Sequence, residues 1–183
     1  MTIARILNLL IVIFELIAFA IVSKRRSLKT GFIYYTQLSN AVTFISSIIF
    51  VIAGGGEFAG VLRYLSVSML AMTFFVTVCI LVPMSRKVKE FLFSGNGLYH
   101  HSIIPVLAVI SYRCFETRVP VTWVWLPVTV TLIYGMVMVY LNATGKVDGP
   151  YPFFQVKRIG AVQTVFWMIG LLIATSFLSL AVL

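Results

Sequence analysis

The chain has 183 residues, of which 61% are hydrophobic and 10% are charged, and its mean hydropathy is +1.06. A soluble domain is about half apolar and about a quarter charged, so this composition excludes an ordinary soluble protein. It predicts a single transmembrane helical domain over residues 1–183. Lys and Arg number 14 against 5 acids, but they lie mostly between apolar segments. The excess therefore indicates membrane orientation rather than binding to nucleic acid.

Six apolar segments follow one another along the chain. They are roughly Ile6–Val22, Phe32–Ala53, Val61–Val82, Leu98–Tyr112, Val119–Leu141 and Ile159–Leu183. Only helices and closed barrels span a bilayer, and a spanning helix needs about 20 residues. Runs this long and continuous predict an all-α, polytopic membrane protein, a six-transmembrane-helix bundle with both termini on the same side. The fourth segment is the shortest of the six.

The basic residues orient this bundle. The side that holds the amino terminus would carry four basic residues: Arg5, Arg63, Arg113 and Arg118. The opposite side would carry ten: Lys24, Arg25, Arg26, Lys29, Arg86, Lys87, Lys89, Lys146, Lys157 and Arg158. The richer side is expected in the cytoplasm, which leaves both termini outside. The starts of the second and fourth segments and the Asp148–Phe154 turn, DGPYPFF, then all lie at the cytoplasmic surface.

The second segment carries a polar face. Thr36, Asn40, Thr43 and Ser47 recur at offsets of four, seven and eleven residues, which places them along one side of a helix. Small polar residues often hold membrane helices together, and this interpretation suits Thr43, Ser46 and Ser47. We interpret Thr36 and Asn40 instead as the wall of a functional site.

The two histidines, His100 and His101, begin the fourth segment. Adjacent residues point about 100° apart on a helix, so they do not chelate a metal as an i, i+4 pair would. Cys79 and Cys114 show no metal-binding spacing either, and we expect no metal and no cofactor. Pro105 frees the carbonyl of His101 from helical pairing, which favours His101 as the inward-facing residue and a general base. The alternative is an interfacial histidine that only makes local hydrogen bonds.

Glu15 is the only acid deep inside an apolar segment, and ionisable groups there are functional candidates. It can be protonated, pair with Arg113, or orient a histidine. A threonine hydroxyl and an imidazole at the same depth can form a nucleophile and base pair. Side chains following Thr36 can donate hydrogen bonds to a developing oxyanion; the candidates are Gln37, Ser39 and Asn40.

Three short motifs carry a family resemblance. They are Tyr35-Thr36-Gln37-Leu38-Ser39-Asn40, His101-Ser102-Ile103-Ile104-Pro105 and Tyr151-Pro152-Phe153. The chain resembles a group of small bacterial integral membrane proteins that are similar to the androgen-induced and androgen-dependent TFPI-regulating proteins. The resemblance implies a bacterial cytoplasmic membrane protein that hydrolyses fatty acid esters of hydroxy fatty acids. The nucleophile and the histidine would be Thr36 and His101, although the neighbouring His100 leaves two candidates for the second role.

The expected function is therefore an intramembrane hydrolase of lipid esters, whose partners are a fatty acid ester substrate and the bilayer. Tyr35, Tyr151 and Phe153 are further candidates for substrate binding. One alternative is a small-solute or ion transporter or channel lined by the polar face of the second segment; however, Pro83, Pro105 and Pro127 show no repeat symmetry. Another is a non-catalytic membrane assembly protein. The sequence does not specify an oligomeric state.

Overall fold

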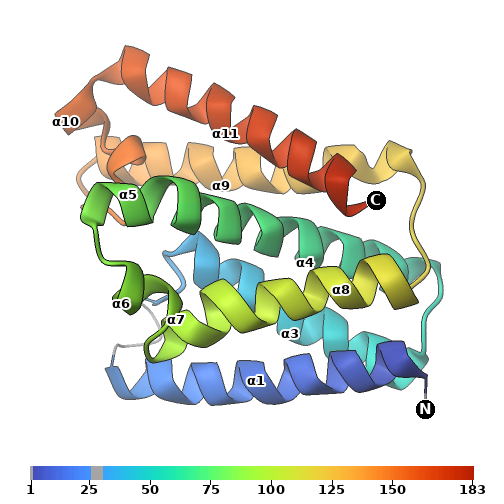
Figure 1. Cartoon of the computed structure of the whole chain (residues 1–183). Helices are drawn as coiled ribbons and strands as arrows, with labels where there is room; N and C mark the ends of the chain where they lie inside the picture. Colours follow the sequence, from blue (N-terminus) through green and yellow to red (C-terminus); the bar gives the residue numbers. More distant parts are fainter. Residues whose placement is uncertain (1, 26–30) are drawn as a thin grey trace.

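The computed structural model describes residues 2–25 and 31–183, and within these ranges the chain forms helices and no strands. The long helices lie side by side and run back and forth along one axis, with both termini at the same end (Figure 1). They are α1 (Ile3–Arg25), α3 (Tyr35–Ala53), α4 (Glu57–Val76), α8 (Ile104–Phe115), α9 (Trp125–Ala143) and α11 (Ala161–Val182). The shorter helices α5 (Val82–Ser85), α6 (Val88–Leu92), α7 (Asn96–Leu98) and α10 (Val156–Ile159) gather at the other end.

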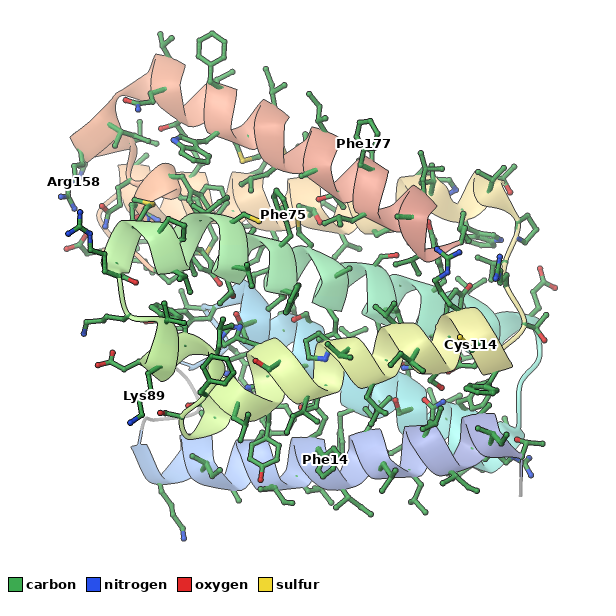
Figure 2. The ribbon with its side chains drawn as sticks, viewed as in Figure 1. Phe14, Phe75, Lys89, Cys114, Arg158 and Phe177 are labelled. Carbon is green, nitrogen blue, oxygen red and sulfur yellow. The ribbon has the colours of Figure 1, made fainter. Side chains whose placement is uncertain are left out.

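Among the described residues, five helical stretches are long and apolar enough to cross a membrane, which confirms an all-α protein with membrane-spanning helices. They are Ile3–Lys24, Tyr35–Ala53, Glu57–Ser85, Val121–Ala143 and Ala161–Val182. The outer faces suit lipid: Phe177 of α11 is 72% exposed and points away from the bundle (Figure 2). The fourth predicted segment is not among the five, since α8 has only 12 residues. Its helix nevertheless packs against α1 and α4.

Two π-helical turns interrupt the bundle, and each lies just before a proline. The first, η1 (Thr77–Leu81), precedes Pro83, and the second, η2 (Tyr99–Ile103), precedes Pro105. Proline lacks an N–H and frees a carbonyl one turn back, and π turns commonly accommodate such defects. The expected disturbance at Pro105 is therefore present.

Four helices are tied together at the end that holds the termini. The Arg63 guanidinium of α4 donates to both carboxylate oxygens of Glu116 at 3.0–3.3 Å, and the two side chains are 0% and 1% exposed. Asn8 of α1 and Ser111 of α8 also donate to Glu116, at 2.9 and 2.6 Å. Arg63 donates further to Ser47 of α3. Arg63, which is counted above among the charges that orient the bundle, is thus paired inside it rather than exposed at its surface.

The remaining polar residues of α3 form hydrogen bonds inside the bundle. Ser46 donates to Ser66 of α4 at 2.9 Å, Thr43 donates to the Ser39 carbonyl at 2.8 Å, and Ser47 accepts from Arg63. The bonds of Ser46 and Ser47 join α3 to α4, as inferred for helix packing, whereas the bond of Thr43 lies within α3. The helix ends at Gly54, whose φ of 76° is the left-handed conformation that glycine adopts easily.

Candidate functional site

A cavity of about 520 Å³ lies at the end of the bundle opposite the termini. Its lining residues are Val22, Gly31, Tyr34, Thr36, Gln37, Leu81, Glu90, Phe91, Ser94, Asn96, Gly97, His101, Pro150 and Tyr151. Glu90 is exposed, so the cavity reaches the surface of the molecule. The predicted nucleophile, the predicted base and the Tyr151 turn thus border one space. We call it the outer cavity.

Thr36 lies in the first turn of α3, and this helix begins directly after the extended residue Tyr34. Its carbonyl accepts from Asn40 Nδ2 at 2.7 Å and from Ser39 Oγ at 3.0 Å. Its side chain and the Tyr151 ring line the same two cavities. Burial raises the pKa of the Tyr151 phenol above its ordinary value, and the Thr36 contact offsets part of this shift. The phenol therefore stays protonated at neutral pH and can donate a hydrogen bond beside Thr36.

His101 has a hydroxyl partner, but the partner is Thr77 rather than Thr36. Thr77 Oγ1 lies 3.0 Å from His101 Nδ1, and both side chains are buried. Thr77 belongs to η1 and His101 to η2, so this contact joins the two π turns. When Nδ1–H donates to the Thr77 hydroxyl, Nε2 of His101 is the nitrogen that can accept a proton. Sequence reasoning missed Thr77, although Thr73 and Thr77 repeat at the four-residue spacing of one helix face.

His100 also points into the bundle, where it is fully buried. The expectation that only one histidine faces inward was wrong. Both histidines are buried because η2 is covered on two sides: His100 meets Glu15 of α1 and Gln37 of α3, and His101 meets Thr77 of η1. His100 Nε2 lies 3.3 Å from Glu15 Oε2, and His100 Nδ1 lies 3.3 Å from Gln37 Nε2. Glu15 therefore contacts a histidine, as its expected role of orienting a histidine requires. It does not pair with Arg113, which is exposed and donates to the Ala181 carbonyl.

The other predicted side chains divide between the helix contacts and a second cavity. Ser39 and Asn40 are fully buried and line neither cavity; Ser39 Oγ lies 2.9 Å from Thr73 Oγ1. Tyr35 and Phe153 lie deeper than Thr36 in the aromatic cluster. The Tyr35 phenol lies 2.9 Å from Thr131 Oγ1.

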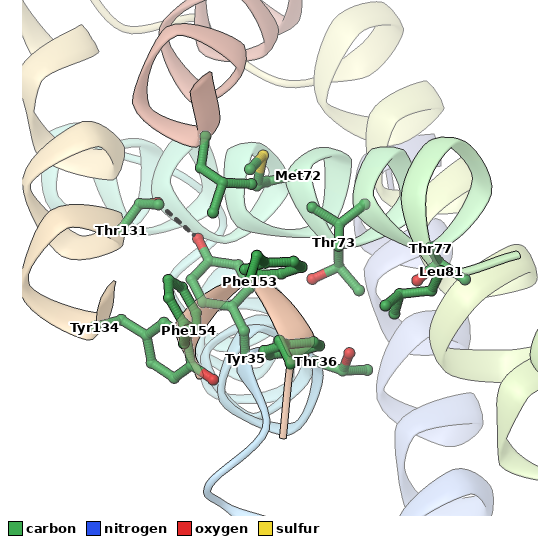
Figure 3. Close-up of a pocket in the computed structure, with 13 residues that line it drawn as sticks. Tyr35, Thr36, Met72, Thr73, Thr77, Leu81, Thr131, Tyr134, Phe153 and Phe154 are labelled. Atoms are coloured by element: carbon green, nitrogen blue, oxygen red, sulfur yellow. Dashed lines mark hydrogen bonds between the residues drawn. The ribbon is translucent and has the colours of Figure 1, made fainter. Parts of the chain in front are cut away.

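This second space, the inner cavity, measures about 30 Å³ and is shown in Figure 3. It is lined mainly by apolar and aromatic side chains: Tyr35, Thr36, Met72, Thr73, Val76, Thr77, Leu81, Thr131, Tyr134, Tyr151, Phe153, Phe154 and Leu171. Thr36, Leu81 and Tyr151 line both cavities, so they form the boundary between them. Asn142 fixes the neighbouring turn, because its side chain pairs with both the N–H and the carbonyl of Gly149.

Within the described ranges, no three His, Cys, Asp or Glu side chains come close enough to hold a metal ion. Comparison with known proteins found no matching family, no matching curated protein and no matching solved structure. The chemistry of the site is therefore argued from its own geometry.

Proposed function

We propose that the protein is an intramembrane hydrolase of fatty acid esters, in which Thr36 is the nucleophile and His101 the base. The observation that carries the proposal is that both residues line one cavity of about 520 Å³ that reaches the surface. Thr77, at 3.0 Å from His101 Nδ1, orients the base. A nucleophile, a base and a group that orients the base are the parts that covalent ester hydrolysis needs.

The reaction has two steps. His101 Nε2 takes the Thr36 hydroxyl proton as the oxygen attacks the ester carbonyl, and it then returns the proton to the leaving alcohol. The acyl group is left on Thr36 Oγ1, and a water deprotonated by His101 releases it as a fatty acid. The protonated Tyr151 phenol beside Thr36 and the Gln37 amide on the cavity wall are the donors for the oxyanion of each tetrahedral intermediate.

The basic residues at the cavity end of the molecule also support an arrangement in the membrane. We propose six crossings, with Asn96–Phe115 as the fourth, the outer cavity facing the bacterial cytoplasm and both termini outside. Lys89 and Arg158 lie at the cavity end, which supports this orientation (Figure 2). Arg26 and Lys29, which belong to the same argument, lie outside the described residues. The inner cavity of about 30 Å³ is too small for an acyl chain, so the acyl chain of a lipid ester would lie in the outer cavity of about 520 Å³.

Transport is less well supported than hydrolysis. A transporter or channel needs a route to both sides of the membrane. At the terminal end the Arg63–Glu116 pair and its partners Asn8, Ser47 and Ser111 fill the space between α1, α3, α4 and α8. A pathway through the bundle would have to break these buried bonds. A purely structural assembly role gives no reason for a surface-accessible cavity lined by Thr36 and His101.

The test is hydrolysis of a series of fatty acid esters by the purified protein in detergent or nanodiscs. Thr36→Ala and His101→Ala should each lower kcat by at least about 10²-fold, the lower range for losing a general base. Thr43→Ala is the matched control, since Thr43 is a buried threonine of α3 that lines neither cavity. Mass spectrometry of a slow ester should find the acyl group on the Thr36 peptide. Acylation of Thr77, or full activity in Thr36→Ala, would contradict the assignment.

A further inference from the structure

Glu15 and His100 form an acid–imidazole pair that the two-step reaction above does not use. Both side chains are 0% exposed, and Glu15 Oε2 lies 3.3 Å from His100 Nε2. Among the described residues, three atoms of this pair lack a partner of good hydrogen-bond geometry. They are both carboxylate oxygens of Glu15 and the Nε2 of His100. The pair is thus in contact, and a small rotation would turn this contact into a hydrogen bond.

The bundle interior constrains the charge of this pair. An isolated carboxylate is very costly in a low-dielectric interior, and no Lys or Arg of the described ranges forms an ion pair with Glu15. The pair is therefore net neutral. Either Glu15 is protonated and donates to Nε2 of a neutral His100, or a carboxylate faces an imidazolium. A third neutral arrangement, in which Nε2–H donates to a protonated Glu15, would leave Nδ1 as an acceptor; in the first two, the Nδ1 of His100 carries a proton.

This proton decides how the Gln37 amide is oriented. Gln37 is the neighbour of Nδ1, and in the amide orientation that the structure records its Nε2 lies 3.3 Å from this ring nitrogen. A protonated Nδ1 is a donor and needs an acceptor, and the acceptor that Gln37 offers is Oε1. A half turn of the amide exchanges its oxygen and NH₂ with almost no change in shape. The NH₂ group then faces the outer cavity, which Gln37 lines.

We propose that Glu15 and His100 are positioning residues that hold Gln37 with its NH₂ toward the outer cavity, where it donates to the oxyanion of the bound ester. This role rests on the proposed hydrolase function. Without the pair, the amide is free to turn its oxygen toward the cavity, where it would repel the developing negative charge. Loss of one oxyanion donor typically lowers kcat by about 10²–10³-fold.

The first test reads the proton directly and needs no enzymatic activity. In the protein labelled with ¹⁵N-histidine, nitrogen chemical shifts should show His100 protonated at Nδ1, with the resonances assigned from a His100→Gln variant. Glu15→Leu removes the donor to Nε2 and should move the proton of His100 to Nε2. A wild-type His100 that is neutral and protonated at Nε2 would overturn the proposal, whether or not the protein hydrolyses any ester.

The second test uses kinetics. Glu15→Leu and Gln37→Leu should each lower kcat by about 10²-fold or more with little change in KM, and the double variant should be no worse than either. Glu15→Gln supplies an NH₂ donor to Nε2 and should recover most of the rate that Glu15→Leu loses. Ile11→Val, a buried substitution on the same helix, controls for packing. A Glu15→Gln variant as slow as Glu15→Leu would contradict the orienting role. If the wild type hydrolyses no ester, the hydrolase proposal fails, and the nitrogen shifts still decide the arrangement of the pair.

Discussion

The buried ion pair at the terminal end offers the sharpest test of the fold. Replacing Arg63 by Met keeps an unbranched side chain and removes the charge, which leaves the Glu116 carboxylate 1% exposed with only Asn8 and Ser111 as donors. Removing one partner of a buried pair costs about 3–5 kcal/mol, because the other charge stays buried and uncompensated. Glu116→Gln leaves the guanidinium in the same position and should cost a similar amount.

The double variant measures the interaction energy between Arg63 and Glu116 apart from their other contacts. Arg63→Met/Glu116→Gln buries no net charge, so we expect its loss of stability to be smaller than the sum of the single losses by about 2–3 kcal/mol, at the upper end of coupling energies between contacting residues. Arg118→Met is the control, because Arg118 is exposed, and it should change stability by no more than about 0.5 kcal/mol.

The assay is reversible unfolding of the purified protein in mixed micelles, with the free energy of unfolding obtained for all four variants and the wild type. Because the pair is buried, the losses should also change little with ionic strength. Single variants that each cost less than about 1 kcal/mol, or a double variant whose loss equals the sum, would refute the argument that this cluster locks α1, α3, α4 and α8 together.

Three further predictions concern the cavity end. In an ester hydrolysis assay, the Thr36→Ala/His101→Ala double variant should be little slower than either single variant, since the two groups act as a unit, and Thr36→Ser should keep part of the rate. Thr77→Val should lower kcat about 10–100-fold, less than His101→Ala, because it removes the group that orients the base and not the base itself; an unchanged rate would remove Thr77 from the site. Cysteines placed at Ser94 and Thr144 should react with a membrane-impermeant thiol reagent from one side of the membrane, and a cysteine at Gly55 from the other; labelling of all three from the same side would exclude the proposed crossings.

The helical layout could be read from the sequence because it depends on local properties. Long apolar runs and the spacing of polar residues are set by neighbours in the chain. The structure has helices at these runs and bonds between helices at Ser46 and Ser47. The short fourth segment was the exception. Its helix consists of α7, η2 and α8 in succession, so its length is not carried by one regular helix.

The contacts of the site depend on residues far apart in the chain, and local spacing does not reveal them. Arg63 and Glu116 are 53 positions apart, and Thr77 and His101 are 24 apart. Counting basic residues places Arg63 on the terminal side but does not reveal that its guanidinium is buried and paired with Glu116. The burial of His100 was missed for the same reason, since it depends on contacts with Glu15 and Gln37, which lie far from it in the chain.

The buried polar groups form two clusters with opposite consequences. At the terminal end, the Glu116 carboxylate accepts three kinds of donor, and among the described residues of this cluster only Asn8 Oδ1 lacks a hydrogen-bond partner. At the other end, Glu15 has no well-formed hydrogen bond and lies behind His100, which is linked through Gln37 to a cavity that reaches the surface. Polar groups that only stabilise a fold tend to be fully satisfied, whereas incompletely satisfied ones gather where chemistry occurs. The contrast between the two ends is the physical reason to look for the reaction at Thr36 and His101, and for structural stability at Arg63.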